Sequence, residues 1–180
     1  MGDRQSAFLL DFAVAFHRHF GTDFSWNGGQ AFDNTAGLLT HKAGRRAVGV
    51  RKAERFELGD LTTVFRGHKI IVEFESKQVS ISNLLKYWPY LRGELSTKPT
   101  NPVLLCHFSD WWSYAVNRDL WEWTISRMQA DSGCLVGVTG CQFDHGGKDL
   151  SLRCSSIEAA LLWLKAQLPQ AAPGAPERAA

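Results

Sequence analysis

The segment from Lys69 to Lys77, whose alternate residues form an apolar set and a set containing two glutamates, constrains this chain more than any other feature. Successive side chains of a β-strand point to opposite faces of the sheet. One face therefore carries Ile70, Val72 and Phe74, and the other carries Ile71, Glu73, Glu75 and Lys77. The turn Arg66-Gly67-His68 joins this strand to another over 61–65. We expect a β-hairpin with one apolar and one acidic face.

Helical and strand-like patterns alternate along the rest of the chain. Before the hairpin, the sequence predicts a helix over 6–20 that Gly21 ends and a strand over 47–56. After it we expect a helix starting near Ser80 or Ser82, a strand over 103–108, a helix over 113–130, a strand pair around 134–138 and 150–154, and a last helix opened by a capping box of Ser155 and Glu158. This order predicts an α/β fold, with a mixed central β-sheet flanked by helices.

Apolar residues at helical spacing predict which side chains of these helices are buried. The predicted core residues are Leu84, Leu85, Trp88 and Leu91 in the first helix after the hairpin, Leu120, Trp123 and Met128 in the next, and Ile157, Ala160, Leu161, Leu164 and Leu168 in the last. This assignment leaves Lys86, Tyr87, Tyr90 and Arg92 as candidates for contact with a nucleic acid.

A chain of 180 residues with 44% hydrophobic residues buries one core. We therefore expect a single domain over 1–168 and a disordered Ala/Pro-rich tail over 169–180. Apolar stretches are too short to cross a bilayer, and no leader pattern is present, so the expected location is the cytoplasm, without membrane contact. A net charge of +2 gives no general attraction to polyanions, so any nucleic-acid site must come from local clusters.

The acidic face of the predicted strand is the main candidate site. Two carboxylates spaced i, i+2 opposite an apolar face are costly unless solvent, a cation or a metal compensates them. The tight turn brings Asp60, at the start of the preceding strand, beside Glu73 and Glu75. Oxygen ligands of this kind suit Mg²⁺, with Mn²⁺ as a substitute. The competing interpretation is the solvated face of an edge strand.

At these residues the chain resembles the PD-(D/E)xK, or restriction-endonuclease-like, nuclease superfamily. The resemblance covers about 57–91 and consists of Gly59-Asp60, a hairpin, Ile71-Val72-Glu73-Phe74-Glu75-Ser76-Lys77 and a helix. It implies a restriction-endonuclease-like core and a metal-dependent endonuclease that hydrolyses phosphodiester bonds of DNA. The alternative is a catalytically inactive nuclease-like module that binds nucleic acid or a protein partner.

Two alignments of the motif compete. In the favoured one, Glu73 is a metal ligand and Glu75 takes the position of the usual Lys; in the other, Glu75-Ser76-Lys77 keeps the Lys. The resemblance thus implies Asp60, Glu73, Glu75 and Lys77 as catalytic residues, with the first three as metal ligands. Lys86 on the following helix is a substitute cation in either alignment.

DNA contacts are assigned to cationic and polar residues around the motif, namely Arg51, Lys52, Gln78, Lys86 and Arg92. Cutting both strands with one site per chain calls for a homodimer with two-fold symmetry. The sequence has no Gly-rich phosphate loop, so no nucleotide cofactor is expected. The thiols of Cys134, Cys141 and Cys154 with His145 lack zinc-site spacing, and we expect the four cysteines to be reduced.

Overall fold

The computed structural model describes residues 3–26, 39–41, 58–75, 81–95, 97–109, 115–147 and 149–169. Its centre is a six-stranded sheet in the order β2-β1-β3-β4-β5-β6. The strands are β1 (Phe24–Trp26), β2 (Leu39–His41), β3 (Leu61–Phe65), β4 (His68–Glu75), β5 (Val103–Ser109) and β6 (Val138–Asp144). Antiparallel pairs join β1, β3 and β4, whereas β4, β5 and β6 run parallel. The predicted α/β fold with a mixed sheet is confirmed.

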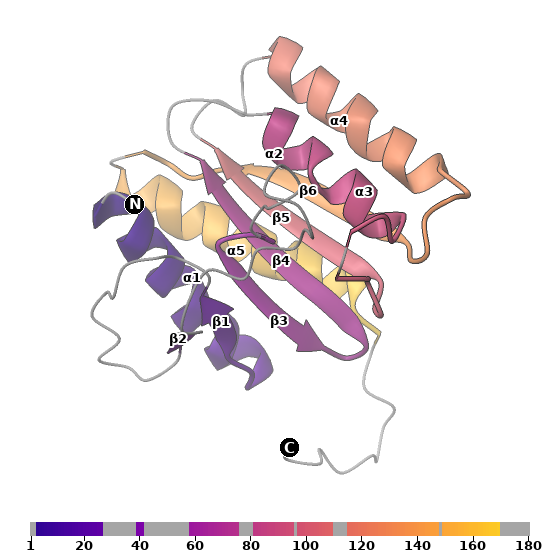
Figure 1. The fold of residues 1–180 in the computed structure, drawn as a ribbon. Coiled ribbons are helices and arrows are strands. Elements are labelled where there is room, and N and C mark those ends of the chain that lie inside the picture. Colours follow the sequence, from indigo (N-terminus) through magenta and orange to yellow (C-terminus); the bar gives the residue numbers. More distant parts are fainter. Residues whose placement is uncertain are drawn as a thin grey trace.

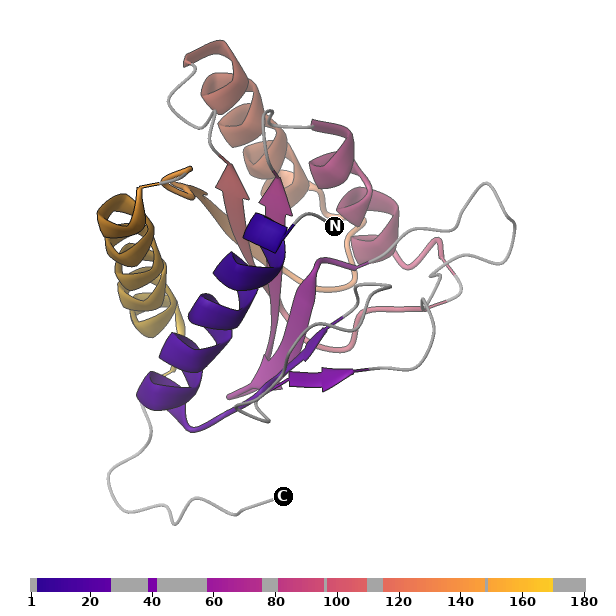
Figure 2. The ribbon, with the colours of Figure 1, turned by 90° about the vertical axis from the view of Figure 1, so that its left-hand side faces the viewer.

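Helices cover both faces of the sheet (Figures 1 and 2). On one face lie α1 (Asp3–Phe20) and α5 (Leu150–Gln167), and on the other lie α2 (Ile81–Leu85), α3 (Tyr87–Leu91) and α4 (Ala115–Ala130). The first core layer includes Ile70, Val72 and Phe74 of β4, and the second includes Ile71. The predicted alternation of β4 between two faces is therefore confirmed.

The β3–β4 hairpin closes on a two-residue turn. Arg66 and Gly67 both have positive φ, 46° and 76°, the backbone combination that fits the twist of paired strands. His68, expected in the turn, is instead the first residue of β4 and pairs with Phe65. The hairpin fixes the register that sets Leu61 opposite Val72.

The terminal helices follow the sequence prediction closely. α1 starts three residues before the predicted Ser6 and ends at Phe20, where Gly21 adopts φ 67° and donates its N–H to the His17 carbonyl at 2.8 Å. Its apolar stripe packs on the sheet through Phe8, Phe12 and Phe16. The predicted core residues of α5 are all buried: Ile157, Ala160, Leu161, Leu164 and Leu168.

The buried face of α4 differs from the prediction. Leu120 and Trp123 are 44% and 55% exposed, and the core residues are Trp121, Ile125 and Met128. Both sets have helical spacing, so periodicity cannot choose between them. The contacts of α4 with α2 and β6 place Trp121, Ile125 and Met128 in the core. Leu120 and Trp123 are left on the surface.

The segment before α5 also differs from the prediction. Neither of the two strands expected near the C-terminus forms where it was predicted: β6 at Val138–Asp144 shares only Val138 with the strand expected around 134–138, and residues 150–154 belong to α5. Asp149 caps this helix by accepting the N–H groups of Ser151 at 2.9 Å and Leu152 at 3.2 Å. The observed cap, Asp149, therefore lies six residues before the predicted cap, Ser155, because the side chain of Asp149 accepts free N–H groups of the first helical turn.

The predicted helix after the hairpin is divided into α2 and α3 at Lys86. Tyr87 and Tyr90 are buried, at 1% and 3% exposure, while Leu85, predicted in the core, is 44% exposed. The prediction that both tyrosines contact nucleic acid is wrong. The predicted strand over 47–56 and the tail from residue 170 lie outside the described residues. Among the described helices, none has the length and apolarity that a bilayer crossing demands.

Candidate functional site

The acidic face of β4 lies in the interior of the fold, toward the carboxyl ends of the parallel strands. β4 is flanked by β3 and β5, and Glu73 and Glu75 are only 5% and 8% exposed. The parallel register aligns Glu73 with His107 and Glu75 with Ser109 of β5. The interpretation as a solvated edge-strand face is therefore wrong. Buried carboxylates of this kind require polar or cationic partners.

Asp60 is fixed across the hairpin from Glu73. Its backbone N–H donates to the Val72 carbonyl at 2.8 Å. Its Oδ2 accepts the Phe74 N–H at 2.8 Å, and its Oδ1 accepts the amide of Gln5 from α1 at 3.1 Å. These contacts with two elements hold the carboxylate beside β4, as predicted from the turn.

The approach of Asp60 to β4 depends on the glycine before it. Gly59 has φ 75°, and a Cβ atom there would lie 2.4 Å from Cγ2 of Ile71. Both the left-handed backbone and the close contact exclude ordinary side chains. Gly59-Asp60 is thus a structural unit in which glycine allows the chain to bring the carboxylate against the neighbouring strand.

Burial and the charge of Glu73 together raise the pKa of Asp60 from 3.8 to about 7. The Phe74 N–H, Lys86 and Gln5 act in the opposite direction but do not offset these two causes. Near neutral pH the protonated and ionised forms of Asp60 are therefore close in free energy, first because of burial and second because of the charge of Glu73. An added cation near Asp60 would stabilise its ionised form.

Glu73 has two partners from the other side of the sheet. Tyr87 Oη donates to its Oε1, and the ammonium group of Lys86 forms an ion pair with the same oxygen. Burial, followed by the charge of Glu73, raises the pKa of Tyr87 well above its ordinary value, so the phenol remains a neutral donor. Lys86 occupies the break between α2 and α3. At this break the consecutive side chains of Lys86 and Tyr87 both contact the Glu73 carboxylate.

Glu75 is held by a different set of side chains. Asn83 of α2 donates to its Oε1, and Nε2 of His107 lies 3.4 Å from its Oε2. Trp121 of α4 donates its indole N–H to Nδ1 of His107 at 2.8 Å. Because Nδ1 accepts this hydrogen bond, a neutral His107 carries its proton on Nε2, the nitrogen that faces Glu75.

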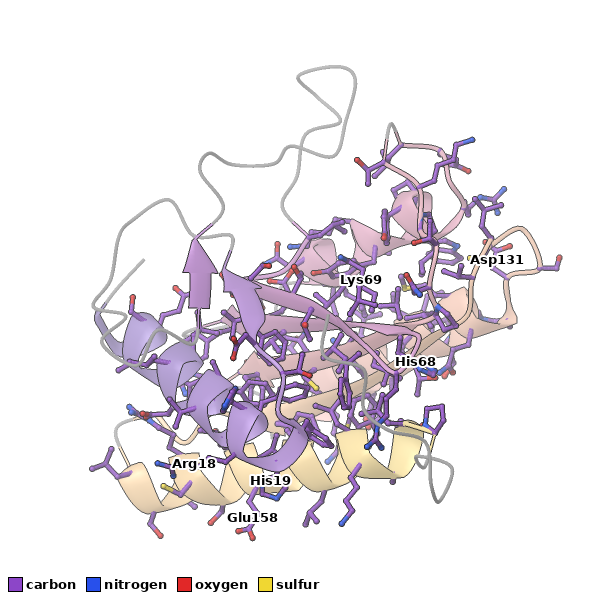
Figure 3. The ribbon with its side chains drawn as sticks, turned by 90° about the horizontal axis from the view of Figure 1, so that it is seen from below. Arg18, His19, His68, Lys69, Asp131 and Glu158 are labelled. Carbon is purple, nitrogen blue, oxygen red and sulfur yellow. The ribbon has the colours of Figure 1, made fainter. Side chains whose placement is uncertain are left out.

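The structure brings together four of the predicted site residues: Asp60, Glu73, Glu75 and Lys86. Arg92 is not among them, because it forms ion pairs with Glu94 at 2.6 Å and Asp131 at 2.8 Å. Asp131 lies at the opposite end of the molecule, labelled in Figure 3 together with His68 and Lys69 at the start of β4. The remaining predicted residues, Lys77, Gln78, Arg51 and Lys52, lie outside the described residues.

The sequence analysis missed Gln5, Asn83 and His107, which contact the carboxylates, and Trp121, which donates to His107. A signal existed for His107, the one histidine in the apolar run of β5. Its position aligns with Glu73 in the parallel pair. No local signal distinguishes Gln5, because its contact spans 55 residues of chain.

The residues at this site fit Mg²⁺ in chemistry. Within the described part of the chain, no group of three or more His, Cys, Asp or Glu side chains is arranged to hold a metal ion. Mg²⁺ does not require such a group, since it is commonly bound by one or two carboxylates, with water and substrate phosphate as the other ligands. Asp60 and Glu73 provide two carboxylates, and burial together with the charge of Glu73 raises the pKa of Asp60.

The same finding disfavours the alternative zinc site. Cys134, Cys141, Cys154 and His145 are all among the described residues, and they do not form a metal-binding group there. All four cysteines are free thiols, and Cys154 is exposed. Comparison of the chain with family models, with curated proteins and with solved structures found no match.

Proposed function

We propose that this protein is a metal-dependent endonuclease that hydrolyses phosphodiester bonds of DNA, with Mg²⁺ held by Asp60 and Glu73. The observation that carries the proposal is the position of two carboxylates, the buried Glu73 and the partly buried Asp60, across the β3–β4 hairpin, where burial and the charge of Glu73 raise the pKa of Asp60 to about 7. Two carboxylates held this close in a poorly solvated site destabilise the fold, and strongly shifted pKa values of this kind cluster at functional sites.

The order of the elements supports the proposal. Asp60 precedes β3, the hairpin leads into β4 with Glu73 and Glu75, and α2 follows. This is the order on which the resemblance to PD-(D/E)xK nucleases rests, and a restriction-endonuclease-like core remains part of the proposal. DNA as substrate comes from that resemblance alone.

Each residue of the site has a distinct chemical role in this proposal. Bound Mg²⁺ would supply a Lewis acid at the scissile phosphate and lower the pKa of a coordinated water. Asp60 is oriented by the Phe74 N–H and Gln5, so its carboxylate is positioned before any ligand arrives. Lys86, now paired with Glu73, is the nearby cation that can move to the negative charge of a phosphate.

The contacts of Glu75 favour the first of the two alignments. Asn83 donates to one oxygen of its carboxylate, and His107 Nε2 lies 3.4 Å from the other. We therefore assign Glu75 a supporting position next to Glu73, with Lys86 supplying the positive charge. Lys77, the catalytic cation in the other alignment, lies outside the described residues.

A second candidate is the catalytically inactive module. The specific observation in its favour is that Lys86 and Tyr87 already contact Glu73, so that carboxylate is compensated without a metal. In this case Lys86 is a permanent structural counter-ion. The two candidates differ in whether a divalent cation displaces it.

Thermal unfolding with and without Mg²⁺ separates the candidates independently of activity. A ligand that binds only the folded state at ten times its Kd stabilises the fold by about 1.4 kcal/mol. We expect about this gain in the wild type with millimolar Mg²⁺, and its loss in Asp60→Asn and Glu73→Gln. Ca²⁺ is the control for a divalent cation that binds without supporting catalysis. Na⁺ at matched ionic strength is the control for the screening of charges by salt.

Cleavage of supercoiled plasmid by the same three proteins then tests the chemistry. The proposed enzyme requires Mg²⁺ or Mn²⁺ and loses activity in both variants. Mg²⁺ stabilisation without cleavage would favour the inactive module, and neither stabilisation nor cleavage would refute the metal site.

A further inference from the structure

The outer face of α4 carries an unpaired apolar stripe. Val116, Leu120 and Trp123 are 71%, 44% and 55% exposed. With Arg127 and Ala130, also exposed, they follow the 4-3-4-3 spacing that forms the contact seam of paired helices. The inner face is occupied by Trp121, Ile125 and Met128, so α4 is apolar on two faces and only one of them meets the core.

Figures 1 and 2 place α4 at the periphery of the molecule, beyond α2 and α3. A shallow hollow of about 430 Å³ runs beside the stripe and is lined by Asp119, Glu122, Trp123, Ser126, Arg127 and Ala130. The guanidinium of Arg127 lies 5.3 Å from the centre of the Trp123 ring. Large exposed aromatic residues beside Arg are typical of the centres of protein interfaces.

The charges along the outer face of α4 favour a second copy of α4 in the antiparallel direction. The first half of the stripe is flanked by Asp119 and Glu122, and the second half by Arg127. Arg118 lies 3.7 Å from Asp119 and 3.9 Å from Glu122 within the same helix, which leaves the first half with a net negative charge. A parallel copy of α4 would set like charges together, whereas an antiparallel copy sets each acidic half against Arg127 of the other.

We propose that the protein forms a homodimer through antiparallel pairing of α4 with α4 of a second copy, with Trp123 near the two-fold axis. The pairing is isologous, so each contact occurs twice. α4 has 16 residues and is about 24 Å long, which limits the buried area. We therefore expect an interface at the small end of the specific range and a Kd on the order of micromolar.

Sedimentation equilibrium of the full chain tests the proposal. The wild type should pass from 20.1 kDa toward about 40 kDa as its concentration rises through the micromolar range. Trp123→Glu should remain monomeric throughout. Leu162→Glu is the matched control, because Leu162 is 59% exposed on α5 and should associate like the wild type. Circular dichroism of each variant checks that it is folded.

A charge-swap experiment tests the direction of pairing. Arg127→Glu makes both halves of the stripe acidic, and Asp119→Lys with Glu122→Lys makes both halves basic. Each variant alone should lose at least about tenfold in affinity, and an equimolar mixture should form a heterodimer. A monomeric wild type, a dimer that survives Trp123→Glu, or a mixture that stays monomeric would each overturn the proposal.

Discussion

Replacing Asp60 by Asn removes the charge of a buried carboxyl group while nearly keeping its shape. Asp60 has a folded-state pKa of about 7 against 3.8 in the unfolded chain. Between these values the folded state binds a proton that the unfolded state has released. The free energy of unfolding of the wild type therefore decreases, relative to Asp60→Asn, as the pH rises from about 4 to about 7.

The size of this effect follows from the same two pKa values. At 1.36 kcal/mol per pH unit, the full interval corresponds to about 4 kcal/mol. Asp60 keeps part of its surface in water, which reduces this effect. The acceptor oxygen that Asn lacks shifts the stability of the variant equally at every pH, so it does not enter the relative change. We expect a relative decrease of about 2 kcal/mol.

Urea unfolding of both proteins from pH 4 to pH 8, without divalent cations, measures the difference directly. Repeating the series in Mg²⁺ should flatten the pH dependence of the wild type, because a bound cation stabilises the ionised carboxylate. The reasoning is refuted if the difference between the two proteins stays constant from pH 4 to pH 8 without metal, since Asp60 would then titrate as an ordinary exposed group.

Three further predictions concern the neighbours of Asp60. Glu73→Gln should lower the pKa of Asp60, because it removes the charge that raises it, and should reduce plasmid cleavage by about 10²–10³-fold; NMR titration of the carboxyl carbon and a cleavage assay check the two effects. Lys86→Met should raise the pKa of Asp60 and tighten Mg²⁺ binding in calorimetry while still impairing cleavage. Trp121→Phe removes the donor to His107 Nδ1 and should cost about 1 kcal/mol in urea unfolding, and ¹⁵N NMR should show the loss of the single Nε2–H tautomer present in the wild type.

Local patterns predicted the parts of this fold that short-range rules determine. The period of two in β4 places its side chains correctly on two faces. The turn at Arg66-Gly67 is likewise set by local backbone preferences. Asp60 and Glu73 are brought together by that one hairpin, so their proximity followed from about a dozen consecutive residues.

The errors arise where tertiary contacts decide between equivalent local solutions. In α4 two apolar stripes share the helical period, and packing on α2 and β6 chose the one with Trp121. After the hairpin, Leu84 and Leu91 share a helical face with both Tyr87 and Trp88, and Tyr87 is the one that is fully buried, at 1% exposure. His107 joined the site only through the pairing of β4 with β5, 34 positions along the chain, a distance over which no local rule operates.

The course of α4 has a consequence for how DNA would be cut. Trp121, which reaches His107 beside Glu75, lies on the inner face near the middle of α4, two residues from Trp123 on the outer face. In the antiparallel dimer, both copies of α4 would therefore lie between the two sets of carboxylates. We expect two sites separated in this way to cut the strands of a duplex in separate encounters, converting supercoiled plasmid first to open circles and only later to linear molecules.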